Sequence, residues 1–232
     1  MMKQIQALLY FFAVDSRRTV TIFCSILLLS ITILSVLAVS VVDFMYITIT
    51  LPAYIFMVIF GFRTIQESLP FAIKRGITRK SYHTAVGVFI LLISLVMITF
   101  LLALQLLFHA VYQAANITNI QILRPISAST EMKSILYSLP LDFAFLLSFF
   151  AVGLLLGIVI YKFGFLGGAI LGGIVLIGIT ITLASRERLV DLFTWMQDLA
   201  LLPAFGLICA IAIVSFMISW VFIRTSSSQH TA

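Results

Sequence analysis

The stretch that decides the fold runs from Ala85 to Ala110 and reads AVGVFILLISLVMITFLLALQLLFHA. It contains no aspartate, glutamate, lysine or arginine. About 20 apolar residues suffice for a helix to cross a bilayer, and a helix satisfies its backbone hydrogen bonds within the segment. The hydrophobicity is continuous and lacks the alternation of a membrane β-barrel strand. The stretch therefore predicts a transmembrane helix.

The whole chain has the same character. Its 232 residues are 62% hydrophobic and only 9% charged, whereas about a quarter of the residues in a soluble domain are charged. Such a chain is an integral membrane protein with short loops and no room for a soluble catalytic domain. We expect six transmembrane helices, over Thr19–Val41, Phe44–Phe62, Ala85–Ala110, Leu141–Ile160, Gly164–Leu183 and Leu201–Ile223.

The N-terminal segment has a different pattern. Over residues 3–15, Ile5, Leu8, Leu9 and Phe12 recur at helical spacing while polar residues lie between them. This pattern is typical of an amphipathic helix that lies in the membrane interface.

The predicted fold is thus all-α: an interfacial helix over residues 1–18, a six-span membrane domain over residues 19–223 and a polar tail over residues 224–232. No signal-peptide cleavage site follows the first apolar stretch, because charged residues stand there instead.

The basic residues predict the orientation. If the N-terminus is cytoplasmic, ten of the 14 lysines and arginines lie on the cytoplasmic side, and the positive-inside rule favours that arrangement. The ten are Lys3, Arg17, Arg18, Arg63, Lys74, Arg75, Arg79, Lys80, Lys162 and Arg224. We therefore expect both termini in the cytoplasm. The net charge of +6 could suit nucleic acid, but charges at the membrane rim match anionic lipid better.

Enzyme signatures are absent from the sequence. No GxxxxGK[ST], HExxH or GxSxG motif occurs. Cys24 and Cys209 lie far apart inside apolar runs, which suggests neither a disulfide nor a metal cluster. We therefore predict that the chain is not an enzyme and binds no metal or cofactor of its own.

Two sets of intramembrane residues are candidates for a role beyond simple packing. Gln105 and His109 stand four positions apart on one face of a predicted span, where they could line a polar path or form interhelical hydrogen bonds. Five glycines repeat at four-residue spacing, which lets helices approach closely, within this chain or in a dimer. These glycines are Gly153, Gly157, Gly164, Gly168 and Gly172.

The segment between Arg63 and Thr84 is longer than a simple turn needs. Ser68 can cap a short helix, Gly76 can end it, and Thr78 can begin the next one. That short helix would expose three apolar side chains on the cytoplasmic face, where apolar residues seek a partner or lipid. These are Leu69, Phe71 and Ile73.

Two motifs carry a resemblance to a known family. Residues Lys74–Tyr82 read KRGITRKSY, and residues Tyr161–Gly164 read YKFG. Both are similar to elements of the type-2 ABC exporter permeases, the six-span subunits of bacterial ATP-driven exporters. The resemblance implies that residues from Glu67 to Lys80 form a coupling helix that docks into a separate cytosolic ATPase.

The resemblance also implies partners and roles. Leu69, Phe71 and Ile73 would insert into a groove on the ATPase, with Arg75 and Arg79 adding charge complementarity at the rim. Glu67 and Lys80 belong to the same coupling segment. ATP and magnesium would bind the ATPase, and a second permease copy or a relative would complete the exporter in the bacterial plasma membrane. An amphipathic peptide, antibiotic or lipid would suit an uncharged passage. The alternative is a membrane scaffold or immunity protein that transports nothing, or a basic loop that only binds anionic lipid.

Overall fold

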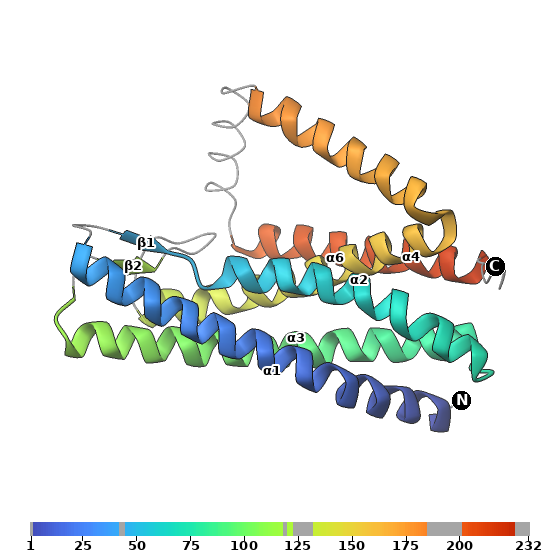
Figure 1. Cartoon of the computed structure of the whole chain (residues 1–232), viewed down its shortest axis with the longest axis horizontal. Helices are drawn as coiled ribbons and strands as arrows, with labels where there is room; N and C mark the ends of the chain where they lie inside the picture. The colour runs from blue at the N-terminus through green and yellow to red at the C-terminus, as the bar shows by residue number, and fades with distance from the viewer. Residues whose placement is uncertain (1, 42–44, 118–119, 123–131, 185–200, 226–232) are drawn as a thin grey trace.

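The computed structural model describes residues 2–41, 45–117, 120–122, 132–184 and 201–225. Within these ranges the chain is helical apart from two strands of three residues each and the short turns that join the elements. The helices are α1 (Met2–Val41), α2 (Thr50–Lys74), α3 (Arg79–Ala114), α4 (Met132–Ala184) and α6 (Leu201–Thr225). The strands β1 (Met45–Ile47) and β2 (Ile120–Ile122) pair in parallel, with Tyr46 opposite Gln121 (Figure 1).

Four of the described helical segments are long and apolar enough to cross a membrane: Met2–Val39, Arg79–Ala114, Leu139–Gly164 and Leu202–Arg224. The prediction of a helical membrane protein is therefore confirmed, while the six-span count stays a prediction. The second predicted span differs most. Its helix begins at Thr50 rather than Phe44, because Met45–Ile47 is a strand, and it continues past Phe62 to Lys74.

The first helix also differs from the prediction, because α1 continues through residue 18 without a break. No proline or glycine interrupts the polar stretch, and the Ser16 hydroxyl bonds back to the carbonyl of Ala13 within the helix. The predicted apolar face is present, but it packs against the protein: Leu8 and Phe12 are buried. Whether these first turns also lie in the membrane interface stays a prediction.

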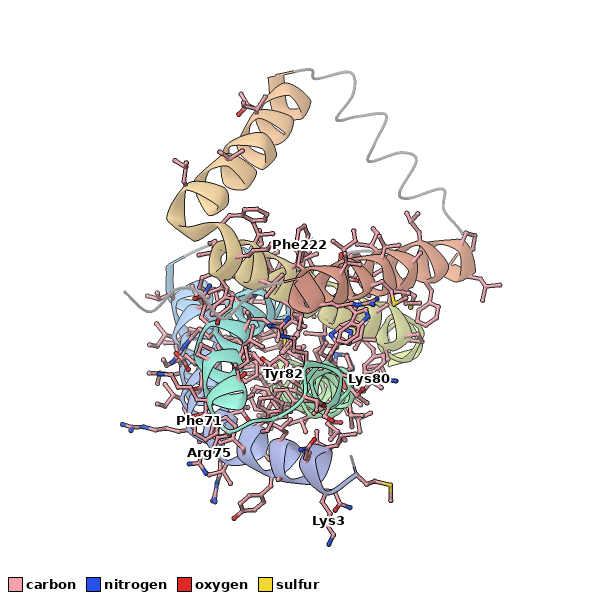
Figure 2. All side chains as sticks on the ribbon, turned by 90° about the vertical axis from the view of Figure 1, so that its right-hand side faces the viewer. Lys3, Phe71, Arg75, Lys80, Tyr82 and Phe222 are labelled. Carbon is pink, nitrogen blue, oxygen red and sulfur yellow. The ribbon has the colours of Figure 1, made fainter. Side chains whose placement is uncertain are left out.

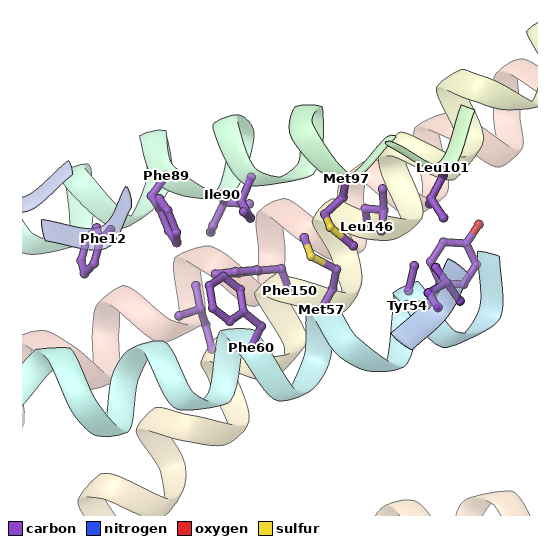
Figure 3. Packing of buried hydrophobic residues seen from close by; sticks show 14 of the residues in the cluster. Phe12, Tyr54, Met57, Phe60, Phe89, Ile90, Met97, Leu101, Leu146 and Phe150 are labelled. Carbon is purple, nitrogen blue, oxygen red and sulfur yellow. The ribbon is translucent and has the colours of Figure 1, made fainter. Parts of the chain in front are cut away.

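The core is formed where α1, α2, α3 and α4 meet. Phe60 of α2, Phe89 of α3 and Phe150 of α4 form a triangle of rings with centroids 5.8 to 6.3 Å apart (Figure 3). Phe12 of α1 joins them, with its ring centroid 5.1 Å from that of Phe89. Because lipid is as apolar as these side chains, close contact rather than transfer from water holds them together.

Glycines bring α2 and α4 into backbone contact. A Cβ atom on Gly153 would collide with the carbonyl of Val58, and one on Gly61 would collide with the carbonyl of Phe150. A Cβ on Gly157 would lie 2.9 Å from the carbonyl oxygen of Phe62. The predicted close approach at Gly153 and Gly157 is confirmed, and its partner is a helix of the same chain.

The second set of glycines has other roles. Gly164 has φ +69°, a left-handed conformation that suits glycine, and it interrupts α4 where the sequence predicts the boundary between two spans. Gly168 faces the side chain of Ile160 across this turn, whereas Gly172 has no atom within 4 Å of a Cβ position. Among the described residues, Gly164, Gly168 and Gly172 therefore do not form a common packing face against another helix of this chain, and their role in a dimer stays a prediction. Beyond Gly164, α4 runs away from the bundle (Figure 1).

At the bundle end opposite the α2–α3 turn, two polar contacts tie the helices together. The Tyr54 hydroxyl of α2 donates to the buried carboxylate of Asp142 in α4 at 2.6 Å. The hydroxyls of Ser35 in α1 and Tyr112 in α3 lie 2.6 Å apart. Such bonds between helices fix their relative register.

Candidate functional site at the turn between α2 and α3

The turn between α2 and α3 has well-formed helix ends on both sides. Gly76, at φ +71°, follows the last turn of α2, and its amide donates to the carbonyl of Ile73 at 3.0 Å. The amide of Ile77 reaches the carbonyl of Ala72 at 3.0 Å, which completes a Schellman-type end. Thr78 then caps α3, with its hydroxyl oxygen accepting from the amide of Ser81 at 3.3 Å. The predicted roles of Gly76 and Thr78 are confirmed.

The predicted separate helix starting at Ser68 is wrong, because α2 is continuous to Lys74 and contains Pro70. The Ser68 hydroxyl does not cap a helix. It bonds back to the carbonyl of Thr64 and lies 2.8 Å from the hydroxyl of the buried Tyr82. This contact with α3 gives Ser68 a partner inside the helix, so the local capping preference is overridden.

The predicted apolar surface is only partly exposed. Leu69 is 1% exposed, so its predicted position on the cytoplasmic face is wrong. Ile73 is half-buried against the core. Phe71 is half-buried, with its ring stacked 4.8 Å from that of Phe11 in α1. The first turns of α1 thus cover part of this side of α2, which sequence reasoning missed by placing them apart from the bundle.

The charged residues separate into paired and exposed groups. Glu67 pairs with Arg63 at 2.7 Å. Arg79 is half-buried, and its Nη1 donates to the carbonyl of Arg224 in α6 at 2.8 Å. The Arg75 guanidinium lies 4.7 Å from the centre of the Phe71 ring, a cation–π contact.

The residues exposed at this turn carry three positive charges. We call Lys74, Arg75, Gly76, Thr78 and Lys80 the turn surface. Figure 2, which looks at this end of the bundle, shows Arg75 and Lys80 on its two sides. The structure brings the basic residues of the predicted coupling segment together here, while it buries Leu69.

A small polar cavity next to this site was not predicted. The cavity lies between α1 and α2 and holds about 50 Å³, which is room for a few water molecules. The rings of Phe12, Phe60 and Phe89 line part of it. Its remaining lining is polar and comprises Asp15, Ser16, Thr19, Arg63, Thr64, Glu67 and Ser68. The charged run near Asp15 inside a helix was the available signal, but the sequence could not show that α2 faces it.

The second candidate pair lies in α3. Gln105 is 2% exposed, and its Oε1 has no hydrogen-bond partner among the described residues. His109 is half-buried, and its Nε2 lies 3.0 Å from Nε2 of Gln113. No hydrogen bond joins Gln105 to His109 in the described structure, so a polar path through this pair stays a prediction.

A conservative substitution tests how tightly Tyr82 holds α2 to α3. We expect Tyr82→Phe to lower the melting temperature by about 2–4 °C, because one buried hydrogen bond contributes about 1 kcal/mol. Thermal unfolding in detergent measures the shift. Tyr10→Phe is the matched control, since Tyr10 is 76% exposed and should leave the melting temperature unchanged. Equal melting temperatures for the two variants would contradict a stabilising role for the Tyr82 hydroxyl.

Comparison with known proteins adds no further guide to the site: no family model, no curated protein and no solved structure matches this chain.

Proposed function

We propose that this chain is the membrane subunit of a bacterial ATP-driven exporter, and that the turn surface docks onto a separate cytosolic ATPase. The observation that carries the proposal is the turn surface itself: three exposed basic residues on a short, capped turn at the end of a membrane-length helix. A rigid turn suits force transmission better than a flexible loop. The motif resemblance over Lys74–Tyr82 supports the same assignment.

Contacts between α2 and α3 next to the turn explain how a movement of the turn would be transmitted along both helices into the membrane. Tyr82 joins α3 to α2 through Ser68, and Phe89 packs against Phe60 on the same two helices. The two helices would therefore move together when the ATPase moves the turn. ATP and magnesium bind the ATPase in this proposal, and this chain supplies the passage together with a second copy or a related permease.

The exported molecule would be amphipathic, such as a peptide, an antibiotic or a lipid. This part of the proposal rests on the apolar helices: four described segments of membrane length carry at most two charged residues in their most apolar windows. A passage between such helices would favour cargo that tolerates an apolar wall.

Purification from native membranes tests the function. We expect an ABC-type ATPase to accompany the tagged chain, and ATP hydrolysis by the purified complex to exceed that of the isolated ATPase. A partner that hydrolyses no ATP would overturn the exporter proposal and favour the membrane scaffold or immunity protein.

The proposed orientation places the turn surface in the cytoplasm. Lys74 and Ala115 are both exposed and lie near opposite ends of α3, whose 36 residues span about 54 Å. In a background with Cys24 and Cys209 replaced by serine, we expect an impermeant thiol reagent on intact cells to label Ala115→Cys and not Lys74→Cys. The reverse labelling pattern would invert the topology and remove the turn surface from the reach of a cytosolic ATPase.

A further inference from the structure

An apolar groove lies between α3, α4 and α6, away from the turn surface. It holds about 350 Å³, and apolar side chains and glycine form its wall. Gly87 and Leu91 line it from α3, Leu147 and Ala151 from α4, and Ile213 and Phe216 from α6. A Cβ on Gly87 would lie 2.9 Å from Cζ of Phe216, so the absence of a side chain there allows the Phe216 ring its position.

The three helices that line the groove each carry a basic residue at the same end of the bundle. Arg79 precedes Leu91 by twelve positions, Lys162 follows Ala151 by eleven, and Arg224 follows Ile213 by eleven. At 1.5 Å per residue each separation is about 17 Å, close to the hydrocarbon depth of one leaflet.

Contacts between the helices show that these ends lie together. The Arg79 guanidinium reaches the carbonyl of Arg224, and the Lys162 Nζ lies 5.3 Å from the ring centre of Phe222 in α6. Figure 2 shows Lys80 and Phe222 at this end of the bundle.

We call Arg79, Lys162 and Arg224 the rim of the groove. Aromatic rings lie between this rim and the groove. The His83 ring stacks 4.0 Å from the Phe216 ring and lies 5.0 Å from the Trp220 ring. His83 lies between Arg79 and Gly87 on α3, and Trp220 lies between Arg224 and Phe216 on α6. The surface therefore changes from basic to aromatic to apolar with depth, which is the order of a phospholipid's own phosphate, interface and acyl chain.

Charge complementarity selects the occupant. Among the described residues no carboxylate forms an ion pair with Arg79 or Arg224, and the Arg79 guanidinium donates to the backbone carbonyl of Arg224, which brings the two basic residues to the same place. An anion beside these residues would be attracted by both positive charges, and a neutral or cationic amphiphile would not.

We propose that the groove and its rim bind one anionic phospholipid of the surrounding membrane. Its phosphate lies against Arg79 and Arg224, and one acyl chain follows the His83 and Trp220 rings into the groove beside Gly87. This inference does not rest on the exporter proposal, because it uses neither the turn surface nor an ATPase.

Tryptophan quenching tests the site directly. The chain has two tryptophans, so Trp195→Phe leaves Trp220 as the only one, at the rim of the groove. The protein is reconstituted in phosphatidylcholine vesicles that contain either brominated phosphatidylglycerol or brominated phosphatidylcholine at the same mole fraction. We expect the anionic lipid to quench Trp220 with about fivefold higher relative affinity, since one basic residue near an anionic headgroup contributes about that factor. Equal quenching by the two lipids would overturn the proposal.

Charge variants distinguish lipid binding at the rim from a general effect of positive surface charge. We expect Arg224→Gln to bring the preference for phosphatidylglycerol close to one, while the Arg79 contact with the residue 224 backbone carbonyl remains available. Lys3→Gln is the matched control, because it removes one exposed charge from α1 at a position away from the groove. Equal loss of preference in both variants would show a surface-charge effect and contradict the site.

Variants in the wall of the groove test whether the lipid occupies the groove as well as the rim. Ala212 lines the groove and Ala210 is exposed outside it, both on α6. We expect Ala212→Phe to abolish the preference by filling the groove and Ala210→Phe to retain it, with both proteins monodisperse in detergent. A preference that survives Ala212→Phe would overturn binding in the groove. If that variant is not monodisperse, the Arg224→Gln comparison decides alone.

Discussion

Replacing Gly153 with alanine is expected to destabilise the protein by about 3 kcal/mol, the upper part of the usual range for inserting a methyl group into a filled interface. The added Cβ would collide with the carbonyl of Val58, which is backbone and cannot rotate away. At about 2–4 °C per kcal/mol for a chain of this size, the melting temperature should fall by about 6–12 °C. Thermal unfolding and the yield of monodisperse protein in detergent measure the effect.

Gly206→Ala is the matched control for that variant. Gly206 lies in α6, and no atom lies within 4 Å of its Cβ position. Alanine forms helix more readily than glycine by about 1 kcal/mol, so this control should be neutral or slightly stabilising. The helix preference is the same for both substitutions, and any difference between them reports contact with α2. Matching melting temperatures would contradict the close approach of α2 and α4.

The α2–α4 contact shows what the sequence could reveal. The four-residue spacing of Gly153 and Gly157 predicts close helix packing without naming the partner, and the partner glycine, Gly61, stands alone in α2. Spacing identifies one side of such an interface when its small residues repeat. A single glycine on the other helix carries no periodic signal, so the pairing appears only in three dimensions.

The turn shows where local signals succeed and where they fail. Gly76 and Thr78 were predicted correctly, because a left-handed glycine and a hydroxyl cap act within a few residues of themselves. The sequence predicts a helix start at Ser68, yet Ser68 lies inside α2. The Tyr82 hydroxyl, fourteen residues beyond Ser68, supplies the contact that a local interpretation cannot include.

The burial of Leu69 has the same origin. Its position in a basic segment between two predicted spans predicts exposure. However, α2 continues as a helix through this segment, and the side chain of Leu69 lies in the core. The strands were not predicted either, because three residues are too few to show an alternating pattern. In the structure the basic side chains of the turn surface are therefore exposed, while Leu69, one of the three predicted apolar anchors, is buried. The expected docking interface consequently depends more on charge than the sequence predicts.

Reversing two charges on the turn surface is therefore expected to have the largest effect on function. Arg75→Glu combined with Lys80→Glu changes the charge of the turn surface from +3 to −1, since only Lys74 remains basic. An ATPase surface that complements the original charge would then face like charges, whose juxtaposition costs several kcal/mol. We expect at least a tenfold loss of ATPase association and loss of ATP-dependent transport, measured by co-purification and by export assays.

Two controls keep this result specific. Lys3→Glu combined with Arg18→Glu makes the same change in net charge at exposed positions of α1, and it should retain ATPase association. Because basic residues also set topology, labelling of Ala115→Cys must show that the reversed variant keeps its orientation. The loss should be smaller at high salt, which screens exposed charges.

The comparison with Phe71→Ala decides how the turn docks. Phe71 stacks on Phe11, so its removal should loosen the contact between α1 and α2 and lower the melting temperature together with ATPase association. The charge reversal should lower association alone, because Lys80 is exposed and Arg75 touches only the Phe71 ring among the contacts described for it. Wild-type ATPase association in the Arg75→Glu, Lys80→Glu variant would contradict the docking role of the turn surface, because an interface that depends on these charges cannot form after their reversal.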